Sequence, residues 1–240
     1  MKIINELLST INREAPVREI RQGPFQRAVL TRYCGLASTP HEAGHHHINN
    51  PVPEAGSLTE KTAQDIAYMA KSGSLYEAAI GMAAINSLLE INEEECKDLN
   101  ARDLIFQKGA GKKVAIVGHF TFVPQLKEHV KDLWVIEKNP REGDRTEAEA
   151  KDLIPRADVV GITGTAFTNH TIEQLLRLLN IKAYVIILGD TAPLSNVLFD
   201  YHIDAICGTR VVDYKAVLTC VGEGATYRQL KGIRQLTMVK

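Results

Sequence analysis

Residues 158–171 read DVVGITGTAFTNHT, a short apolar run followed by a loop rich in glycine and threonine. Similar apolar runs recur beyond residue 109, at 113–117, 133–136, 184–188 and 204–207. Most are rich in valine and isoleucine and are bounded by glycine or a charge, as expected for strands buried on both faces. Helical segments are expected near residues 124–130, 146–153, 171–179, 194–199 and 213–221. This strand–helix alternation predicts a parallel, doubly wound, Rossmann-like α/β sheet.

The first 108 residues have a different pattern. Helical spacing predicts a helix over 1–13, and two strands are expected at 17–21 and 26–36, joined by a turn at residues 23–24. S-x-x-E capping boxes at Ser57 and Ser74 each precede a further helix. The first helix is expected over 62–71, and the second follows the box at Ser74 and runs to residue 89. This order predicts a small α+β domain over residues 1–108, followed after a glycine-rich junction by the α/β domain over 109–240.

The composition is that of an ordinary globular protein. Lys and Arg number 28 against 29 Asp and Glu, a net charge of −1, and no basic run is interleaved with aromatics. Nucleic acid is therefore not expected as a partner. The N-terminal residues carry charge too early for a signal peptide, and no apolar run is long enough to cross a membrane. With four scattered cysteines, we expect a cytoplasmic protein with reduced thiols and no membrane partner.

The residues that follow the expected strands are the main candidates for a site. In doubly wound sheets, ligands bind outside the carboxyl ends of the strands, where the strand order reverses. Four of the five loops there contain glycine, which lets a ligand approach the backbone. A glycine after a strand is also typical of a tight turn, and it is the five loops in succession that favour a site for a small polar or anionic ligand. The candidate residues are Gly118, His119, Glu137, Thr163, Gly164, Thr165, Asn169, Gly189, Asp190, Thr191 and Arg210.

Glu137 and Arg210 have specific alternatives. Glu137 lies about 20 residues after Gly118, where a dinucleotide-binding sheet places its ribose-binding acid. Residues 118–123, GHFTFV, do not match G-x-G-x-x-G, which argues against a standard NAD site. Glu137 then either holds a hydroxyl group of another small molecule or is a solvated acid. Arg210 suits a carboxylate or phosphate, and its alternative is a surface ion pair.

A histidine-rich loop suggests a separate metal site. Residues 41–45 match H-E-x-x-H, but Pro40 and Gly44 would break the helix that a zinc protease needs. Imidazole binds Zn, Cu and Ni, so the histidines predict a site for a divalent metal; they are His41, His45, His46 and His47. The alternative is a solvated loop whose histidines bind nothing.

Six phrases, in order, resemble the putative heavy-metal-chelation family of prokaryotic proteins. They begin at residues 74, 114, 161, 185, 204 and 222, and read SLYEAAIGMAAINSLL, VAIVGHF, GITGTAFTNHTIEQLL, VIILGDTAPLSNVLF, DAICGTRVVD and GEG. The resemblance spans nearly the whole chain. It implies a first domain similar to the enolase N-terminal fold, a Rossmann-like second domain, and a ligand site in the cleft between them. On this resemblance the site adds Pro193 to the candidates above and is faced by the helix over 77–86. Asp190 departs from the proline that the family pattern has there.

Two functions from different classes follow. The first is a cytoplasmic protein that chelates a metal or binds a small anionic metabolite in the cleft. The second is an enzyme that uses His119, Glu137, Asp190 or Glu223 as acid or base, which requires two ionisable groups to converge on one ligand. A third alternative is a purely structural scaffold, in which side chains would fill the cleft. Soft metals prefer thiolates, so chelation in the cleft requires Cys34 and Cys207 to meet. The Ala/Gly-rich helix suits either a domain contact or a homodimer contact.

Overall fold

The computed structural model describes residues 1–11, 14–40 and 52–240. Its largest element is an eight-stranded sheet with the order β4-β11-β10-β9-β8-β5-β6-β7. The strands from β7 to β10 in that order pair in parallel, whereas β11 is antiparallel to both β10 and β4. The expected parallel α/β sheet is therefore confirmed. Its strands are β4 (Cys96–Lys97), β5 (Lys113–Val117), β6 (Asp132–Glu137), β7 (Arg145–Thr146), β8 (Val159–Thr163), β9 (Tyr184–Leu188), β10 (Ala205–Val211) and β11 (Ile233–Val239).

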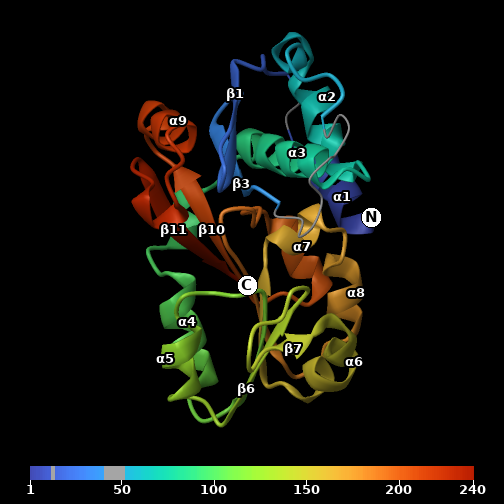
Figure 1. Cartoon of the computed structure of the whole chain (residues 1–240), viewed down its shortest axis with the longest axis vertical. Helices are drawn as coiled ribbons and strands as arrows, with labels where there is room; N and C mark the ends of the chain where they lie inside the picture. The colour runs from blue at the N-terminus through green and yellow to red at the C-terminus, as the bar shows by residue number, and fades with distance from the viewer. Residues whose placement is uncertain (12–13, 41–51) are drawn as a thin grey trace.

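Helices cover both faces of this sheet (Figure 1). Helices α4 (Ala101–Gly109) and α5 (Val123–Lys127) lie on one face, and α6 (Ala150–Leu153), α7 (Thr165–Thr168) and α8 (Ile172–Arg177) lie on the other. Successive residues of a strand point to opposite faces. Val159 accordingly packs toward α4 and α5, and Val160 packs toward α6 and α8. Two covered faces explain why these strands are continuous apolar runs.

A smaller antiparallel sheet carries the N-terminal half. It has the order β1-β2-β3, with β1 (Glu19–Gln22), β2 (Gln26–Leu30) and β3 (Cys34–Ser38). Helix α3 (Leu75–Leu88) packs on one face with α2 (Ala63–Tyr68) beside it, and α9 (Tyr214–Gly222) covers the other face. The Ala/Gly-rich helix α3 therefore makes its contacts inside the chain, and the homodimer stays a prediction.

Two local predictions in this half are wrong. The strand expected over 26–36 is two strands, because the chain turns at 31–33 without a glycine or proline. The Tyr33 N–H donates to the carbonyl of Ser87 (3.0 Å), and the Thr31 hydroxyl bonds the same residue, so α3 stabilises the turn. The capping box lies at Thr62 and Asp65, not at Ser57, whose side chain caps nothing in the described structure.

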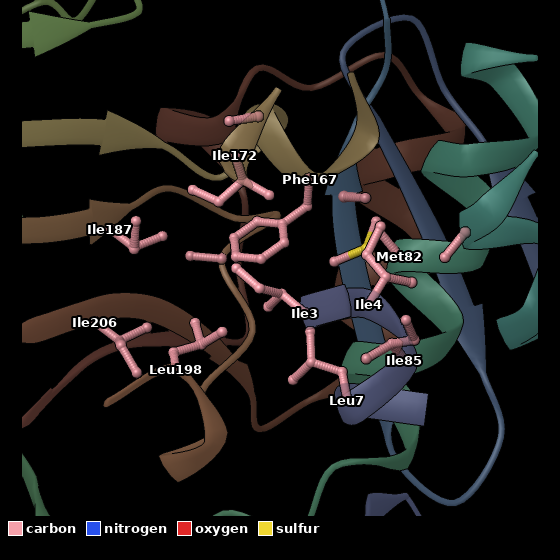
Figure 2. Packing of buried hydrophobic residues seen from close by; sticks show 14 of the residues in the cluster. Ile3, Ile4, Leu7, Met82, Ile85, Phe167, Ile172, Ile187, Leu198 and Ile206 are labelled. Carbon is pink, nitrogen blue, oxygen red and sulfur yellow. The ribbon is translucent and has the colours of Figure 1, made fainter. Parts of the chain in front are cut away.

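The main hydrophobic core joins the two halves of the chain. Helix α1 (Lys2–Thr10) supplies Ile3 and Leu7, and α3 supplies Met82. Figure 2 shows the ring of Phe167 lying between these side chains and those of the large sheet, such as Ile187. No helix in the described ranges has the length and hydropathy of a membrane span. The domain boundary at residue 108 stays a prediction.

Candidate functional site

The strand order of the large sheet reverses between β5 and β8. From β5 the chain moves outward to β6 and β7, and then returns to β8 on the other side of β5. Loops that leave the two strands in opposite directions open a crevice at their carboxyl ends. Gly118 follows β5 with φ +103°, and a Cβ there would lie only 3.0 Å from Cβ of Thr163 at the end of β8. A glycine is therefore needed at this point of the crevice.

Two cavities that share part of their lining open at this point, and we call them together the cleft. Cavity 1 has a volume of about 900 Å³ and reaches toward Glu137 at the end of β6. Cavity 2 has a volume of about 990 Å³ and reaches toward Gly189 at the end of β9. His119, Thr163 and Thr165 line both cavities.

The cleft has a second wall, formed by the small sheet. Gln26 of β2 and Ser38 of β3 line both cavities, and so do the aromatic rings of Phe120 and Tyr227. The phenol oxygen of Tyr227 is 2.8 Å from the hydroxyl of Thr209 on β10. The cleft therefore lies between the two sheets, and it is open space, not a packed interior.

Most of the predicted site residues line the cleft. Cavity 1 is lined by Gly118, His119, Glu137, Thr163, Thr165 and Asn169, and cavity 2 adds Gly164, Gly189 and Asp190. Thr191 and Pro193 are buried and line neither cavity. The histidines at 41 and 45–47 lie outside the described residues.

Arg210 does not line either cavity. The strand β10 extends to Val211, four residues beyond the expected end, so Arg210 lies within the sheet and not in a loop. Its Nε is 3.6 Å from Oε1 of Glu93, and its guanidinium lies over the ring of Tyr33, 4.3 Å from the centroid. The structure therefore shows the ion pair that was the alternative for this residue.

Hydroxyl and imidazole groups lie at the centre of the cleft. The hydroxyls of Thr163 and Thr165 are 3.0 Å apart, so either can donate to the other. The Nδ1 atom of His119 is 3.5 Å from Oδ2 of Asp144, whose side chain is only 7% exposed. This Nδ1 has no hydrogen-bond partner within the part of the chain that the structure describes. His119 and Glu137 also line the same cavity.

Asp190 joins the two walls of the cleft. The Ser38 hydroxyl donates to Oδ1 of Asp190 (2.5 Å), and the Ser38 N–H donates to the hydroxyl of Thr191 (2.9 Å). Burial raises the pKa of the Asp190 carboxyl, and hydrogen bonds from Ser38, Thr191 and Gln26 oppose this increase. The side-chain amide of Asn86 on α3 also donates to the backbone carbonyl of Leu36 (2.9 Å). The same amide lies 3.3 Å from the backbone carbonyl of Thr191, so Asn86 and Ser38 together link the N-terminal half to the loop after β9.

Comparisons with known proteins assign the chain to a family. The family model DUF364, described as "Putative heavy-metal chelation", matches residues 100–240. This chain belongs to the DUF364 family. A second model with the same description, DUF4213, matches residues 4–89.

Known proteins from three organisms are similar to most or all of the chain. The uncharacterized protein MJ0500 of Methanocaldococcus jannaschii is 28% identical over 179 residues, which are 72% of this chain and 69% of that protein. A DUF364 protein of unknown function from Desulfitobacterium hafniense has a crystal structure with TM-score 0.86 and 25% identity, covering 100% of this chain and 98% of that one. One from Pyrococcus horikoshii has TM-score 0.84 and 19% identity with the same coverage, and shows the fold alone.

The donor groups of the cleft do not fit the heavy metal in the DUF364 description. No three His, Cys, Asp or Glu side chains within 1–11, 14–40 and 52–240 lie close enough to hold a metal ion. Cys207 lines cavity 2, whereas Cys34 lies in a different hydrophobic cluster and lines neither cavity. Burial raises the pKa of the Cys207 thiol to about 11 and that of Cys34 to about 12. Both are therefore protonated near neutral pH, and soft metals bind the thiolate.

Asp190→Asn in this DUF364 member is expected to change how stability depends on pH. Because the native pKa of Asp190 is raised, its contribution to stability is full below the unfolded pKa of about 3.9 and is lost as pH rises toward the native pKa. Each unit of that increase corresponds to about 1.4 kcal/mol. Asparagine keeps an acceptor for Ser38 and stays neutral. Urea unfolding should therefore show that the variant gains stability relative to the wild type between pH 4.5 and pH 7.5.

Asp158→Asn is the control for this measurement. Asp158 is exposed, and its carboxylate accepts one backbone hydrogen bond, from Lys113 (2.9 Å). The free energy of unfolding of Asp158→Asn should change with pH in parallel with that of the wild type. If Asp190→Asn also ran parallel, the carboxyl of Asp190 would be ionised in the native protein over this range.

Proposed function

We propose that this protein binds a small, oxygen-rich organic molecule in the cleft. The observation that carries the proposal is the type of groups that line both cavities. They include the hydroxyls of Ser38, Thr163 and Thr165 and the amide of Gln26. Hydroxyl groups both donate and accept hydrogen bonds, so they can pair with the hydroxyl, carbonyl or carboxylate oxygens of such a molecule.

Glycines give such a ligand access to the backbone. Gly189 has φ +117°, and a Cβ built there would meet only the backbone nitrogen of Gly164, at 3.9 Å. Because Gly189 is half-exposed and lines cavity 2, this space belongs to the cavity. Each cavity alone, at about 900 and 990 Å³, has the size of a metabolite site, since ligand pockets have volumes of about 300–1,000 Å³.

Acid–base catalysis in the same cleft is the second candidate function. The imidazole of His119 lies beside the carboxylate of Asp144 (Nδ1 to Oδ2, 3.5 Å), and Glu137 lines the same cavity as His119. A histidine beside acids in a cleft can accept or donate a proton. A binding protein would hold one molecular species. An enzyme would hold substrate and product together, and His119→Gln would shift their ratio toward the substrate.

Gly189→Ala is expected to remove the bound molecule. Untagged protein is purified gently and studied by native mass spectrometry, followed by metal analysis of the same sample. The wild type should carry one organic mass in a 1:1 ratio. The added methyl group occupies ligand space, and we expect the dissociation constant to rise at least about tenfold, equivalent to about 1.4 kcal/mol of binding free energy, so that most of the ligand is lost on purification.

Gly56→Ala is a matched control, because Gly56 also has a positive φ (+107°) and open space around its Cβ but does not line the cleft. Both variants carry the same kind of backbone strain, of order 1 kcal/mol. Only Gly189→Ala should lose the ligand. Equal loss in both variants, or stoichiometric metal without an organic mass in the wild type, would contradict the proposal.

A further inference from the structure

The two cavities of the cleft differ in charge. The described side chains that line cavity 1 include two cations, Lys138 and Arg141, and two carboxylates, Glu137 and Glu147. Cavity 2 is lined by the guanidinium groups of Arg102 and Arg228 and by a single carboxyl, that of Asp190. His119 is common to both. The formal charges of cavity 1 therefore balance, whereas those of cavity 2 do not.

The two guanidinium groups of cavity 2 converge on one short segment. Arg102 on α4 donates to the side-chain oxygen of Gln125 (3.1 Å), and Arg228 donates to the hydroxyl of Thr121. Thr121 and Gln125 are four residues apart around the start of α5. Arg102 and Arg228 are far apart in sequence, and these contacts bring them to the same wall of the cavity.

The carboxyl groups near cavity 2 leave this positive charge available. Asp190 is occupied by donors from its own chain, among them Ser38 and Thr191. Asp103 pairs with one nitrogen of Arg102 (Nη1–Oδ1, 3.2 Å), while Nη2 bonds the uncharged Gln125. Arg228 donates to the hydroxyl of Thr121, which carries no charge. A guanidinium presents five N–H donors, so both groups keep donors for a ligand.

We infer that cavity 2 binds the oxyanion group of the ligand, a phosphate or carboxylate, between Arg102 and Arg228. The inference rests on the proposed function, and it orients the ligand with its anionic group in cavity 2. Guanidinium forks match the oxygen geometry of both anions. The opposite end of the ligand lies in cavity 1, where Glu137 is an acceptor for hydroxyl groups. The ligand class is therefore a hydroxylated metabolite with one anionic group.

Binding of inorganic phosphate and of acetate tests this assignment. The full-length protein is first freed of its bound molecule by extensive dialysis, checked by native mass spectrometry, and each probe is then titrated into it by isothermal titration calorimetry at low ionic strength and pH 7. The wild type should bind at least one of them. Arg102→Gln and Arg228→Gln should each raise the dissociation constant about tenfold, because each removes one charge-assisted interaction. The stronger of the two probes identifies the class of anion. Both arginines are exposed, so the variants should keep the wild-type circular dichroism spectrum.

Arg210→Gln is the matched control, since Arg210 is ion-paired with Glu93 and lies outside both cavities. Its dissociation constant should stay within about twofold of the wild type. Equal weakening in this variant would show that binding depends on positive charge anywhere on the protein and not on cavity 2, and would overturn the assignment. Failure of the wild type to bind either probe would also overturn it. If Gly189→Ala lost its ligand while Arg228→Gln bound phosphate normally, the proposed function would stand and this inference would fail.

Discussion

Gly35→Ala is expected to lower the free energy of unfolding by about 3 kcal/mol or more, at the upper end of what overpacking costs. Gly35 lies in β3 where the strand crosses α3. A Cβ built there would be 2.1 Å from the carbonyl oxygen of Ala83 and 2.3 Å from the backbone nitrogen of Ser87. Both atoms belong to the backbone of α3, so no rotation of a side chain can relieve the contact. Urea unfolding, and the soluble fraction on expression, should show the loss directly.

Gly73→Ala is the control for this substitution. Gly73 precedes α3, and a Cβ there would meet no atom within 4 Å. Its φ is not in the left-handed region, so alanine is compatible with its backbone. We expect a change within about 0.5 kcal/mol of the wild type. If Gly35→Ala lost as little stability as Gly73→Ala, then β3 and α3 could move apart, and their close approach would not be required for stability.

The parallel core of the large sheet could be predicted from the sequence because its physical signal is local. A strand buried on both faces must be apolar throughout, and β5, β8 and β9 are accordingly short valine- and isoleucine-rich runs. The antiparallel edge formed by β11 and β4 could not be predicted in this way. In β11 the first three residues are partly or fully exposed and the next three are buried, so the strand has neither a continuous nor an alternating pattern. Pairing with β10 defines it, and that contact is not local.

The same difference between local and non-local signals explains which residues of the candidate site could be predicted from the sequence. Topology alone places Gly118, Thr163 and Gly189 at one edge of the sheet, because parallel strands end at the same edge. Gln26 and Ser38 were missed because they reach the cleft through packing of the small sheet, and Ser38 meets Asp190 across 152 positions of sequence. No periodicity encodes such a contact. Arg210 was assigned to a loop because the apolar run ends at Cys207, although the strand continues through polar residues to Val211.

Phe167→Ala is expected to lower the free energy of unfolding by about 3–5 kcal/mol, the usual range for truncation of a buried phenylalanine. Phe167 is fully buried, and its ring packs between α1 and the large sheet (Figure 2). It also belongs to α7, which carries Thr165 into the cleft. The cavity left by the ring should therefore weaken ligand binding as well. Urea unfolding measures the first effect, and native mass spectrometry measures the second.

Phe167→Leu and Ile181→Ala are the controls, one conservative and one on the surface. Leucine keeps most of the buried volume and should cost less than about 1.5 kcal/mol, whereas Ile181 is 82% exposed and its truncation should cost less than about 0.5 kcal/mol. The shape of the Phe167→Ala transition is as informative as its midpoint. Because one hydrophobic cluster contains Leu7, Met82 and Ile187, both halves of the chain should unfold together in a single transition. Two separate transitions would instead support independent domains that meet near residue 108.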